Sequence, residues 1–228
     1  MENASINIKG IHVNELFEPG HSVAWGYLSQ FTYPWEGLAG IRDLILELGA
    51  ALDGSEYDQH GEDVWIHKTA TIAPSAHIGN NVIIGADTHV RHCAYIRNNA
   101  LVGKGAVIGN STELKNVILF DAVQVPHFNY IGDSILGYKS HMGAGAITSN
   151  VKSDHSLVTV LCGSGRMETG LKKFGAILGD NVEVGCNAVL NPGTIAGCGT
   201  SIYPLSFVRG FVPPGSIYKR QGEVVMKR

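Results

Sequence analysis

The sequence predicts an all-β protein, a parallel β-helix that turns once every six residues, preceded by a short α-helical segment. The first observation is an aliphatic residue at every sixth position, a period that no helix produces. The second is a small or β-branched residue four positions after each aliphatic one. The third is glycine, asparagine or aspartate in between, where a tight turn needs a residue that tolerates positive φ. The aliphatic residues of the first run are Ile66, Ile72, Ile78, Ile84, Val90, Ile96, Val102, Ile108 and Leu114.

Three short strands joined by three turns close a triangular coil of roughly 18 residues, and stacked coils lie about 4.8 Å apart. The aliphatic residues fill the interior of this prism. The same pattern returns after residue 173, and its members are Leu178, Val184, Leu190, Ala196, Ile202 and Val208. We therefore expect one β-helix over residues 61–212 and a C-terminal tail over 213–228.

Two interruptions break this regularity. Between Leu114 and Met142 the aliphatic spacing slips, and over 151–172 the period disappears in a polar stretch. The second interruption predicts a loop that leaves the prism. Both could be surface decoration, but departures from local rules gather at functional sites, so we expect the site in this region.

The N-terminal segment, 1–60, follows a different pattern. Pro34 leads into an apolar stripe at helical spacing that ends near Gly49 and Gly54, and its members are Leu38, Ile41, Leu44, Ile45 and Leu48. The stripe predicts one amphipathic helix. We expect this segment to cap the open end of the first coil, since an uncovered edge invites aggregation, and a separate binding module is the alternative.

Composition excludes several classes of function. The chain of 228 residues has a net charge of −3, too small for a protein that binds nucleic acid or a membrane surface. Its start lacks the features of a signal peptide, and no stretch has the roughly 18 apolar residues of a membrane span, so we expect a cytoplasmic protein. The four cysteines lack the spacing of a metal site. We expect them to be small buried hydrophobic residues, and we expect no metal.

Arg97 and Lys115 form a candidate anion site. Their separation in the sequence equals one coil of the repeat, so they should occupy one column on neighbouring coils. Two cations held about 5 Å apart repel each other unless an anion lies near them. Arginine with lysine is a common phosphate-binding pair, and a solvated surface pair is the alternative.

Three motifs carry a resemblance to a known family: Glu113-Leu114-Lys115, His127-x-x-Tyr130-x-Gly132-Asp133, and Gly-Ala-Gly-x-Ile-Thr-x-Asn over 143–150. In this order they resemble the acetyltransferase domain of the bifunctional glucosamine-1-phosphate acetyltransferase/N-acetylglucosamine-1-phosphate uridyltransferase, including its archaeal sugar-phosphate relatives. The match runs from about Arg97 to Arg220. The resemblance implies a left-handed β-helix, an exception to the usual right-handed crossover. The family's nucleotidyltransferase domain has no counterpart in this sequence, so uridyl transfer is not expected.

The resemblance implies an acetyl-CoA-dependent N-acetyltransferase that acts on an amino-sugar phosphate such as glucosamine 1-phosphate. His127 matches the general base that takes a proton from the amine as it attacks the acetyl thioester, a role suited to imidazole. Glu113 matches the carboxylate that orients this histidine and stabilises its charged form. The backbone amide of Ala144, which lies between two glycines, matches the donor of the oxyanion hole.

The resemblance also assigns two sets of binding residues. Positions that hold the sugar phosphate, or contact the amino sugar or the acyl donor, are matched by Arg97, Lys115, Tyr130, Asn150 and Lys173. Positions on the coenzyme A wall and near its phosphates are matched by Cys186, Pro204 and Arg220.

Some positions depart from the family pattern. His141 replaces an asparagine of the amino-sugar site, and Val151 replaces a tyrosine. Cys186 replaces a serine and Pro204 replaces a small residue. The acceptor is therefore open, because glucosamine 1-phosphate, galactosamine 1-phosphate and a nucleotide-linked amino sugar share the required amine and phosphate.

Two other functions remain to be weighed. A γ-type carbonic anhydrase shares the fold but needs two histidines at a separation of five positions, and no histidines here have that spacing. The stronger alternative is a non-catalytic sugar-nucleotide-binding or scaffolding protein. We expect a homotrimer, since the flat faces of triangular prisms pack around a threefold axis and family members build their sites between prisms. A separate nucleotidyltransferase is a further expected partner.

Overall fold

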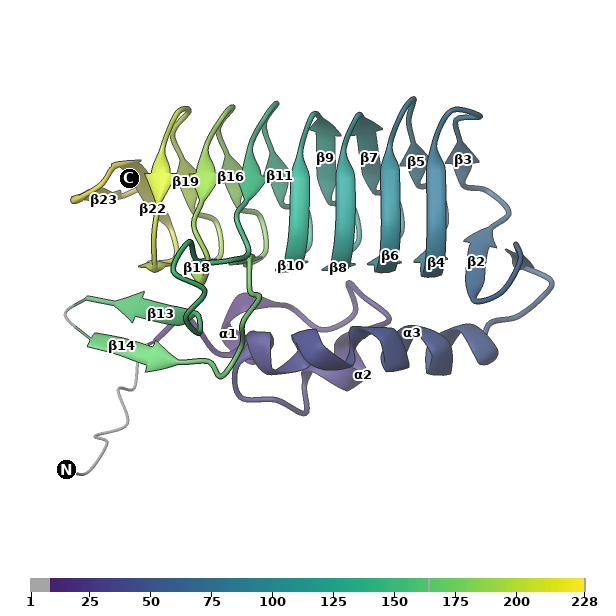
Figure 1. Ribbon diagram of the computed structural model, residues 1–228, viewed down its shortest axis with the longest axis horizontal. Coiled ribbons are helices and arrows are strands. Elements are labelled where there is room, and N and C mark those ends of the chain that lie inside the picture. Colours follow the sequence, from purple (N-terminus) through teal and green to yellow (C-terminus); the bar gives the residue numbers. More distant parts are fainter. Residues whose placement is uncertain (1–8, 164, 228) are drawn as a thin grey trace.

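The protein is a left-handed parallel β-helix in the computed structural model, which describes residues 9–163 and 165–227. The coils stack into a triangular prism whose parallel strands form two large sheets (Figure 1). The nine-stranded sheet makes one side, in the order β23-β22-β19-β16-β11-β9-β7-β5-β3. The twelve-stranded sheet makes the other two sides, because its long strands bend at a residue with positive φ: Asn81, Asn99, Asn116 and Asp133.

The elements have the following bounds. The twelve-stranded sheet contains β1 (Tyr57–Gln59), β2 (Val64–His67), β4 (His77–Ile84), β6 (Tyr95–Val102), β8 (Glu113–Leu119), β10 (Tyr130–Leu136), β12 (Ile147–Thr148), β15 (Ala176–Leu178), β17 (Val189–Leu190), β18 (Thr194–Ala196), β20 (Phe207–Val208) and β21 (Phe211–Val212). The nine-stranded sheet contains β3 (Thr71–Ile72), β5 (His89–Val90), β7 (Val107–Asn110), β9 (Gln124–His127), β11 (His141–Met142), β16 (Glu183–Val184), β19 (Ser201–Ile202), β22 (Ser216–Arg220) and β23 (Glu223–Met226). A separate hairpin contains β13 (Thr159–Cys162) and β14 (Gly165–Glu168). The helical elements are α1 (Val13–Leu16), α2 (Trp25–Leu28), the 3₁₀ helix η1 (Pro34–Gly40) and α3 (Ile41–Ala50).

The predicted aliphatic residues fill the prism. From Ile84 to Leu114 and from Leu178 to Val208, every one of them is buried. The small residues of the repeat are buried beside them, and the hydroxyl of Thr112 donates to the carbonyl of Val125 (2.9 Å). The six-residue period therefore predicted correctly which residues are buried in the interior of the prism.

The slipped region is a change of coil length within the same fold. The coil from Glu113 to its partner Tyr130 is one residue shorter than the coil from His77 to its partner Tyr95. The aliphatic residues of this region remain fully buried, and they are Leu119, Val125, Ile131, Leu136 and Met142. The shortening shifts the spacing in the sequence while the stacking continues.

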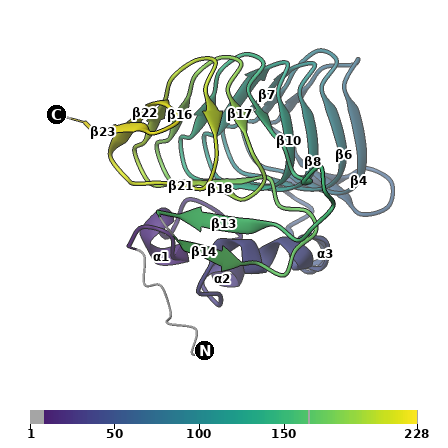
Figure 2. The ribbon, with the colours of Figure 1, turned by 60° about the vertical axis from the view of Figure 1, so that its left-hand side comes forward.

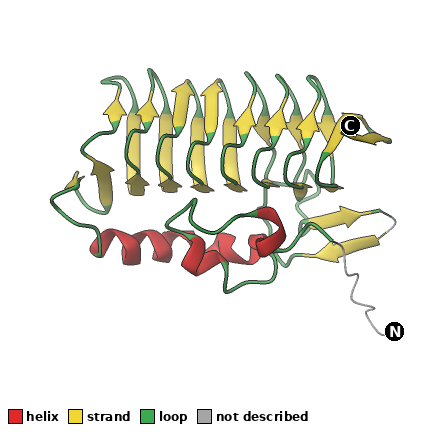
Figure 3. Cartoon of the chain, turned by 180° about the vertical axis from the view of Figure 1, so that it is seen from behind, coloured by secondary structure: helices red, strands yellow, loops and turns green. Residues whose placement is uncertain are grey.

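The N-terminal segment lies along one side of the prism, so the expectation that it caps the open end of the first coil is wrong. Helix α3 packs on β4, β6 and β8, and η1 packs on β10 (Figures 1 and 3). Side chains alternate along a strand, so the residue between two inward-facing ones points outward. On this side the outward residues are themselves apolar and buried: Ile83, Leu101, Ile118, Ile135, Ile177 and Ile195. This outer apolar stripe is what the helical segment covers.

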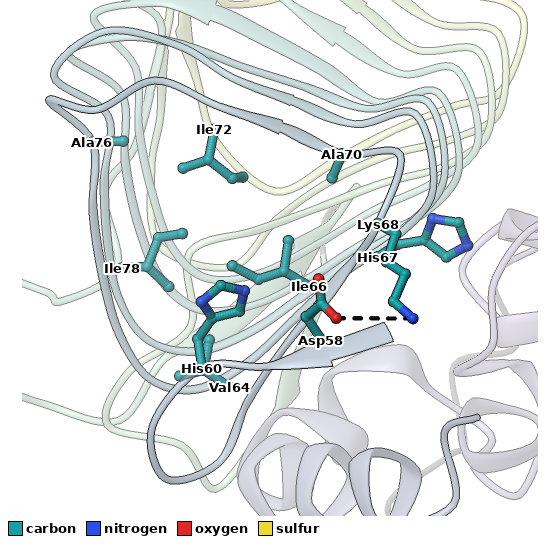
Figure 4. Close-up of a pocket in the computed structure, with 10 residues that line it drawn as sticks. All are labelled: Asp58, His60, Val64, Ile66, His67, Lys68, Ala70, Ile72, Ala76 and Ile78. Carbon is teal, nitrogen blue, oxygen red and sulfur yellow. Dashed lines mark ion pairs between the residues drawn. The ribbon is translucent and has the colours of Figure 1, made fainter. Parts of the chain in front are cut away.

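The open end of the first coil is a cavity of about 430 Å³ (Figure 4). Figure 4 shows Ile66, Ile72 and Ile78 directed into it from the first coil. The edge of the sheet is covered here by β1, which pairs antiparallel with β2. A short antiparallel strand therefore protects the edge that the helix was expected to protect.

The polar stretch after Asn150 leaves the prism and returns at Phe174. It carries the hairpin β13–β14, which packs on β18 and β21, on the same side as the helical segment (Figure 2). At the other end, β22 still pairs parallel with β19, and β23 folds back antiparallel on β22. Parallel stacking therefore continues to Tyr218, beyond the boundary expected at residue 212.

The cysteines differ in their surroundings. Cys162 is buried and Cys198 is half-buried, but Cys93 and Cys186 are exposed. The expectation of four buried cysteines is therefore wrong for two of them. Cys93 has φ +56° and occupies a corner of the prism, where the side chain points away from the core. None of the described helices is long and apolar enough to cross a membrane.

Asp180 joins the N-terminal segment to the prism. Its side chain is buried, and its two carboxylate oxygens accept backbone N–H bonds from Glu18 (2.7 Å) and Tyr138 (2.7 Å). We predict that Asp180→Ala lowers the free energy of unfolding by about 2–4 kcal/mol, because two partly buried backbone N–H groups lose their acceptor. Denaturant unfolding measures this. Asp43→Ala, at a carboxylate 84% exposed on α3, is the control and should cost under about 1 kcal/mol. Equal effects of the two changes would contradict the role given to Asp180.

Candidate active site

One corner of the prism aligns the residues that the sequence selected. At this corner each coil turns through a residue with positive φ, and the residues are Cys93, Ser111, Phe128, Gly145, Asn187 and Leu205. The N–H of each turn residue from Ser111 on donates to the carbonyl of the preceding coil, with N–O distances of 2.8–3.3 Å. These hydrogen bonds stack the residues just before each turn into one column: His92, Asn110, His127, Ala144, Cys186 and Pro204.

The corner column therefore brings together two predicted catalytic positions and two predicted coenzyme positions. His127 and Ala144 are on adjacent coils, about 4.8 Å apart along the axis. Cys186 and Pro204 follow on the next two coils. Arg220 ends β22, whose register places Tyr218 opposite Ile202, so it approaches the same corner. Its Nε donates to Glu223 (2.8 Å), which partly neutralises it.

His127 is presented to solvent at the end of β9. Its ring makes no hydrogen bond to any residue in the described parts of the chain. Its backbone N–H donates to the side-chain oxygen of buried Asn129 (3.1 Å), whose amide donates to the carbonyls of Gly143 and Ala146 (2.8 and 3.0 Å). Asn129 therefore ties the histidine turn to the next coil. The sequence analysis missed this positioning residue, although it lies inside the quoted motif.

The amide of Ala144 is open. Within 9–163 and 165–227 no acceptor receives its N–H, while its carbonyl accepts from the N–H of Asn187 (2.8 Å). Gly143 has no room for a side chain, because a Cβ there would lie 2.7 Å from the backbone nitrogen of Cys186. The Ala144 N–H therefore has no acceptor in the described chain and lies one coil from His127.

Arg97 and Lys115 each pair with their own carboxylate. Arg97 donates to Glu113 (3.0 Å), and the Lys115 ammonium donates to both oxygens of Asp133 (2.9 and 3.1 Å). The premise that these two cations lack an anion is therefore wrong. Glu113 begins β8, and its carboxylate faces Arg97 rather than the His127 ring. The orienting contact expected between Glu113 and His127 is not formed within the described chain.

Asp133 is the centre of a cluster of polar side chains that includes Lys115. The sequence analysis assigned no role to it. Its side chain is 6% exposed and accepts from Lys115, from Asn116 (3.1 Å) and from Asn150 (2.5 Å). Three amide donors lead to it along the bend of the long strands, because Asn81 donates to Asn99 and Asn99 donates to Asn116. The signal available in the sequence was the Gly-Asp that closes the His127 motif.

Tyr130 and Asn150 adjoin Asp133. The Asn150 amide also donates to the phenol oxygen of Tyr130 (3.3 Å), which leaves the phenol proton free to donate to a ligand. Burial raises the pKa of Tyr130, with the charges of Asp133 and Glu113 acting in the same direction, so the phenol stays protonated at neutral pH. A Cβ at Gly132 would lie 2.6 Å from this phenol oxygen, which explains the glycine.

The side chains of the remaining predicted residues make no polar contact with this cluster in the described chain. Lys173 is exposed where the inserted segment returns to the prism, and the structure gives it no polar contact among the described residues. His141 bonds to Glu183 (2.8 Å) on the nine-stranded side, and Val151 is 38% exposed. The structure thus groups the other predicted residues at one corner and the adjoining side.

Two family models match this chain. The description "GMPPB C-terminal domain" belongs to a model that matches residues 87–200, half of the chain. The chain belongs to this family. A second model, "Bacterial transferase hexapeptide (six repeats)", matches residues 59–92. The GMPPB C-terminal domain match begins before Arg97 and includes His127, Ala144 and Asn150.

Relatives of this chain include bifunctional GlmU proteins, as the three motifs predicted. The GlmU protein of Methanococcus vannielii is 31% identical over 159 residues, which cover 70% of this chain and 34% of that protein. A bifunctional sugar-1-phosphate nucleotidylyltransferase/acetyltransferase of Sulfurisphaera tokodaii is 33% identical over 112 residues, covering 49% of this chain and 28% of that protein. The chain thus spans about a third of the length of these relatives.

Among solved structures, the chain matches a hexapeptide transferase family protein from Anaplasma phagocytophilum. The two are 18% identical, the match covers 74% of this chain and 81% of the other, and the TM-score is 0.43.

Proposed function

We propose that this protein transfers the acetyl group of acetyl-CoA to the amine of an amino-sugar phosphate. The observation that carries the proposal is the position of the exposed His127 ring one coil from the open N–H of Ala144. At this spacing, a base can accept the proton of the attacking amine while the N–H donor stabilises the negative carbonyl oxygen in the same acyl transfer. The name of the Sulfurisphaera relative, a bifunctional sugar-1-phosphate nucleotidylyltransferase/acetyltransferase, supports the same chemistry.

In this mechanism the amine nitrogen attacks the thioester carbonyl carbon without a covalent enzyme intermediate. His127 accepts the proton that the amine loses as the C–N bond forms. The carbonyl oxygen becomes negative and accepts the N–H of Ala144. The C–S bond then breaks, and the proton on His127 passes to the departing thiolate. Coenzyme A would extend from this point along the corner column past Cys186 and Pro204.

The sugar phosphate would lie on the adjoining side, against Arg97. Only one bond from this guanidinium goes to Glu113, so most of its five donors remain available, and the side chain is 44% exposed. The phenol of Tyr130 supplies a further donor two coils beyond Arg97. Glu113 and Asp133 hold the two cations in position before the phosphate arrives, which reduces the ordering that binding requires.

A direct assay tests the reaction. The protein is incubated with acetyl-CoA and glucosamine 1-phosphate, and free thiol is measured. A panel with galactosamine 1-phosphate and a nucleotide-linked amino sugar identifies the acceptor. Binding of these compounds without thiol release would instead support the non-catalytic alternative.

We predict that His127→Ala folds normally, binds the sugar phosphate as the parent does, and loses roughly 10²–10⁴-fold in kcat, the usual cost of removing a general base. His89→Ala is the matched control, because His89 is an exposed histidine on the same sheet, and it should retain full activity. Glu113→Gln should lose less kcat than His127→Ala, because the Glu113 carboxylate contacts Arg97 rather than the His127 ring. If His127→Ala keeps more than about a third of the parent rate, the base is another residue, and the His141–Glu183 pair is the next to test.

We predict that Arg97→Ala raises the KM for the sugar 1-phosphate at least about tenfold and leaves the KM for acetyl-CoA within about twofold, since charge-assisted bonds to phosphate are strong. Lys115→Ala should raise the same KM and also lower the melting temperature, because it leaves Asp133 without its cation. Steady-state kinetics measure both. A rise in the KM for acetyl-CoA alone would show that this column holds the coenzyme.

We predict a homotrimer in solution. Exposed apolar residues flank the corner column, where Phe128 is 61% and Leu205 is 79% exposed, and a neighbouring prism would cover them. Sedimentation velocity at micromolar concentration measures the assembly. A monomer there would remove the model of a site shared between prisms.

A further inference from the structure

The inserted hairpin builds a second basic site, separate from the corner column. Two adjoining hollows of about 210 and 410 Å³ lie between the inserted segment and the prism, and Lys152, Pro192 and Arg209 line both. Arg166, from β14, completes the smaller hollow, while Ser149 and Asn191 line the larger one. Three cations from three separate segments therefore meet in one place.

The positive charge of this hairpin site is largely uncompensated. Within the described chain, Asp154 is the one carboxylate that lines either hollow, and it lies 3.8 Å from Lys152. Neither Arg166 nor Arg209 forms an ion pair with any residue that the structure describes. The Arg209 guanidinium lies 5.8 Å from the centre of the Phe207 ring. Cations that converge without counter-charges favour an anionic ligand.

The hairpin is seated closely on the prism, so the hairpin site is formed before any ligand binds. Gly210 lies directly beneath it, because a Cβ there would be 2.4 Å from the carbonyl oxygen of Leu161. Gly193 supports the start of the hairpin in the same way, with a Cβ position 2.8 Å from the carbonyl oxygen of Thr159. Val158 and Val160, at the start of the hairpin, are fully buried.

The strand register gives the distance between the hairpin site and the residues of the proposed reaction. Ser149, Asn191 and Arg209 continue the strand column that contains Lys115, and Arg209 is four strands beyond Lys115. At about 4.8 Å per strand this separation is roughly 19 Å, too far for one sugar monophosphate to contact both. The coil that carries Ala144 is only two coils away, roughly 10 Å along the axis. The hairpin site is therefore too far from Arg97 to contact the phosphate proposed there.

We propose that Lys152, Arg166 and Arg209 bind the phosphate groups of a nucleotide. The neighbouring Phe207 ring, 49% exposed, offers a flat apolar surface on which the base can stack. Two sources supply this chemistry: coenzyme A itself or a nucleotide-linked sugar. The coenzyme A source rests on the proposed function, while the binding of nucleotide phosphates does not.

Titration calorimetry on the full chain tests the proposal with three ligands: coenzyme A, UDP-N-acetylglucosamine and pantetheine, which lacks phosphate. Arg166→Glu and Arg209→Glu should each weaken the phosphate-bearing ligand at least about tenfold. The control, Arg91→Glu, reverses an exposed arginine on the nine-stranded side and should leave binding unchanged. Arg166→Gln, which removes the charge without reversing it, should show a smaller loss, and circular dichroism checks folding.

The outcomes separate the sources. A loss confined to coenzyme A, with pantetheine unaffected, identifies the coenzyme, and a loss confined to the UDP-sugar identifies a sugar nucleotide. The proposal is overturned if the parent binds neither phosphate-bearing ligand, or if the hairpin-site variants bind as tightly as Arg91→Glu. Acetyl transfer is measured separately, so a failure of this site and a failure of the proposed function give different results.

Discussion

Parallel hydrogen bonding between equivalent positions of successive coils determines where the side chains of the corner column and of the Asp133 cluster lie. The corner turn of each coil repeats the same left-handed backbone conformation, and from Ser111 on the N–H of the turn residue donates to a carbonyl one coil back. Residues one coil apart in the sequence are therefore neighbours in space, and an entire column can be built from one residue per coil. The proposed catalytic pair and the coenzyme wall are parts of one such column, the corner column. The phosphate cations Arg97 and Lys115 are part of another. A change of one residue in coil length moves the sequence spacing but leaves these columns aligned.

The features that repeat from coil to coil could be predicted from the sequence. The six-residue period identified the buried aliphatic residues, and the motifs selected His127 and Ala144, which the corner places on adjacent coils. Sequence reasoning could not find the partners of the cations, because Asp133 contacts Lys115 across a bend whose geometry depends on a shortened coil. It also misplaced the helical segment. The outward stripe that begins with Ile83 is visible in the sequence as a further apolar position in each coil, but the sequence analysis did not consider it.

On the polar side of the prism, Arg97 and Lys115 are each paired with a carboxylate. Lys115 is held by a carboxylate that is almost entirely buried, whereas Arg97 is held by one at the surface. Removing the buried partner of an ion pair costs far more than removing an exposed one. Lys115 is thus part of the scaffold as well as part of the candidate site. Arg97 is free to exchange Glu113 for another anion at little cost to the fold.

The position of the N-terminal segment along the prism changes how the molecule should unfold. A bare solenoid is quasi-one-dimensional, since each coil touches only its neighbours and its ends can fray independently. Here α3 contacts β4 through β8, while the carbonyl of Leu16 accepts from the Cys198 thiol and Glu18 donates to Asp180. These contacts join early and late coils through one continuous stretch of chain. Unfolding any coil in contact with the N-terminal segment also disturbs the contacts of that segment with the other coils. The coils are therefore expected to unfold together, as one cooperative unit.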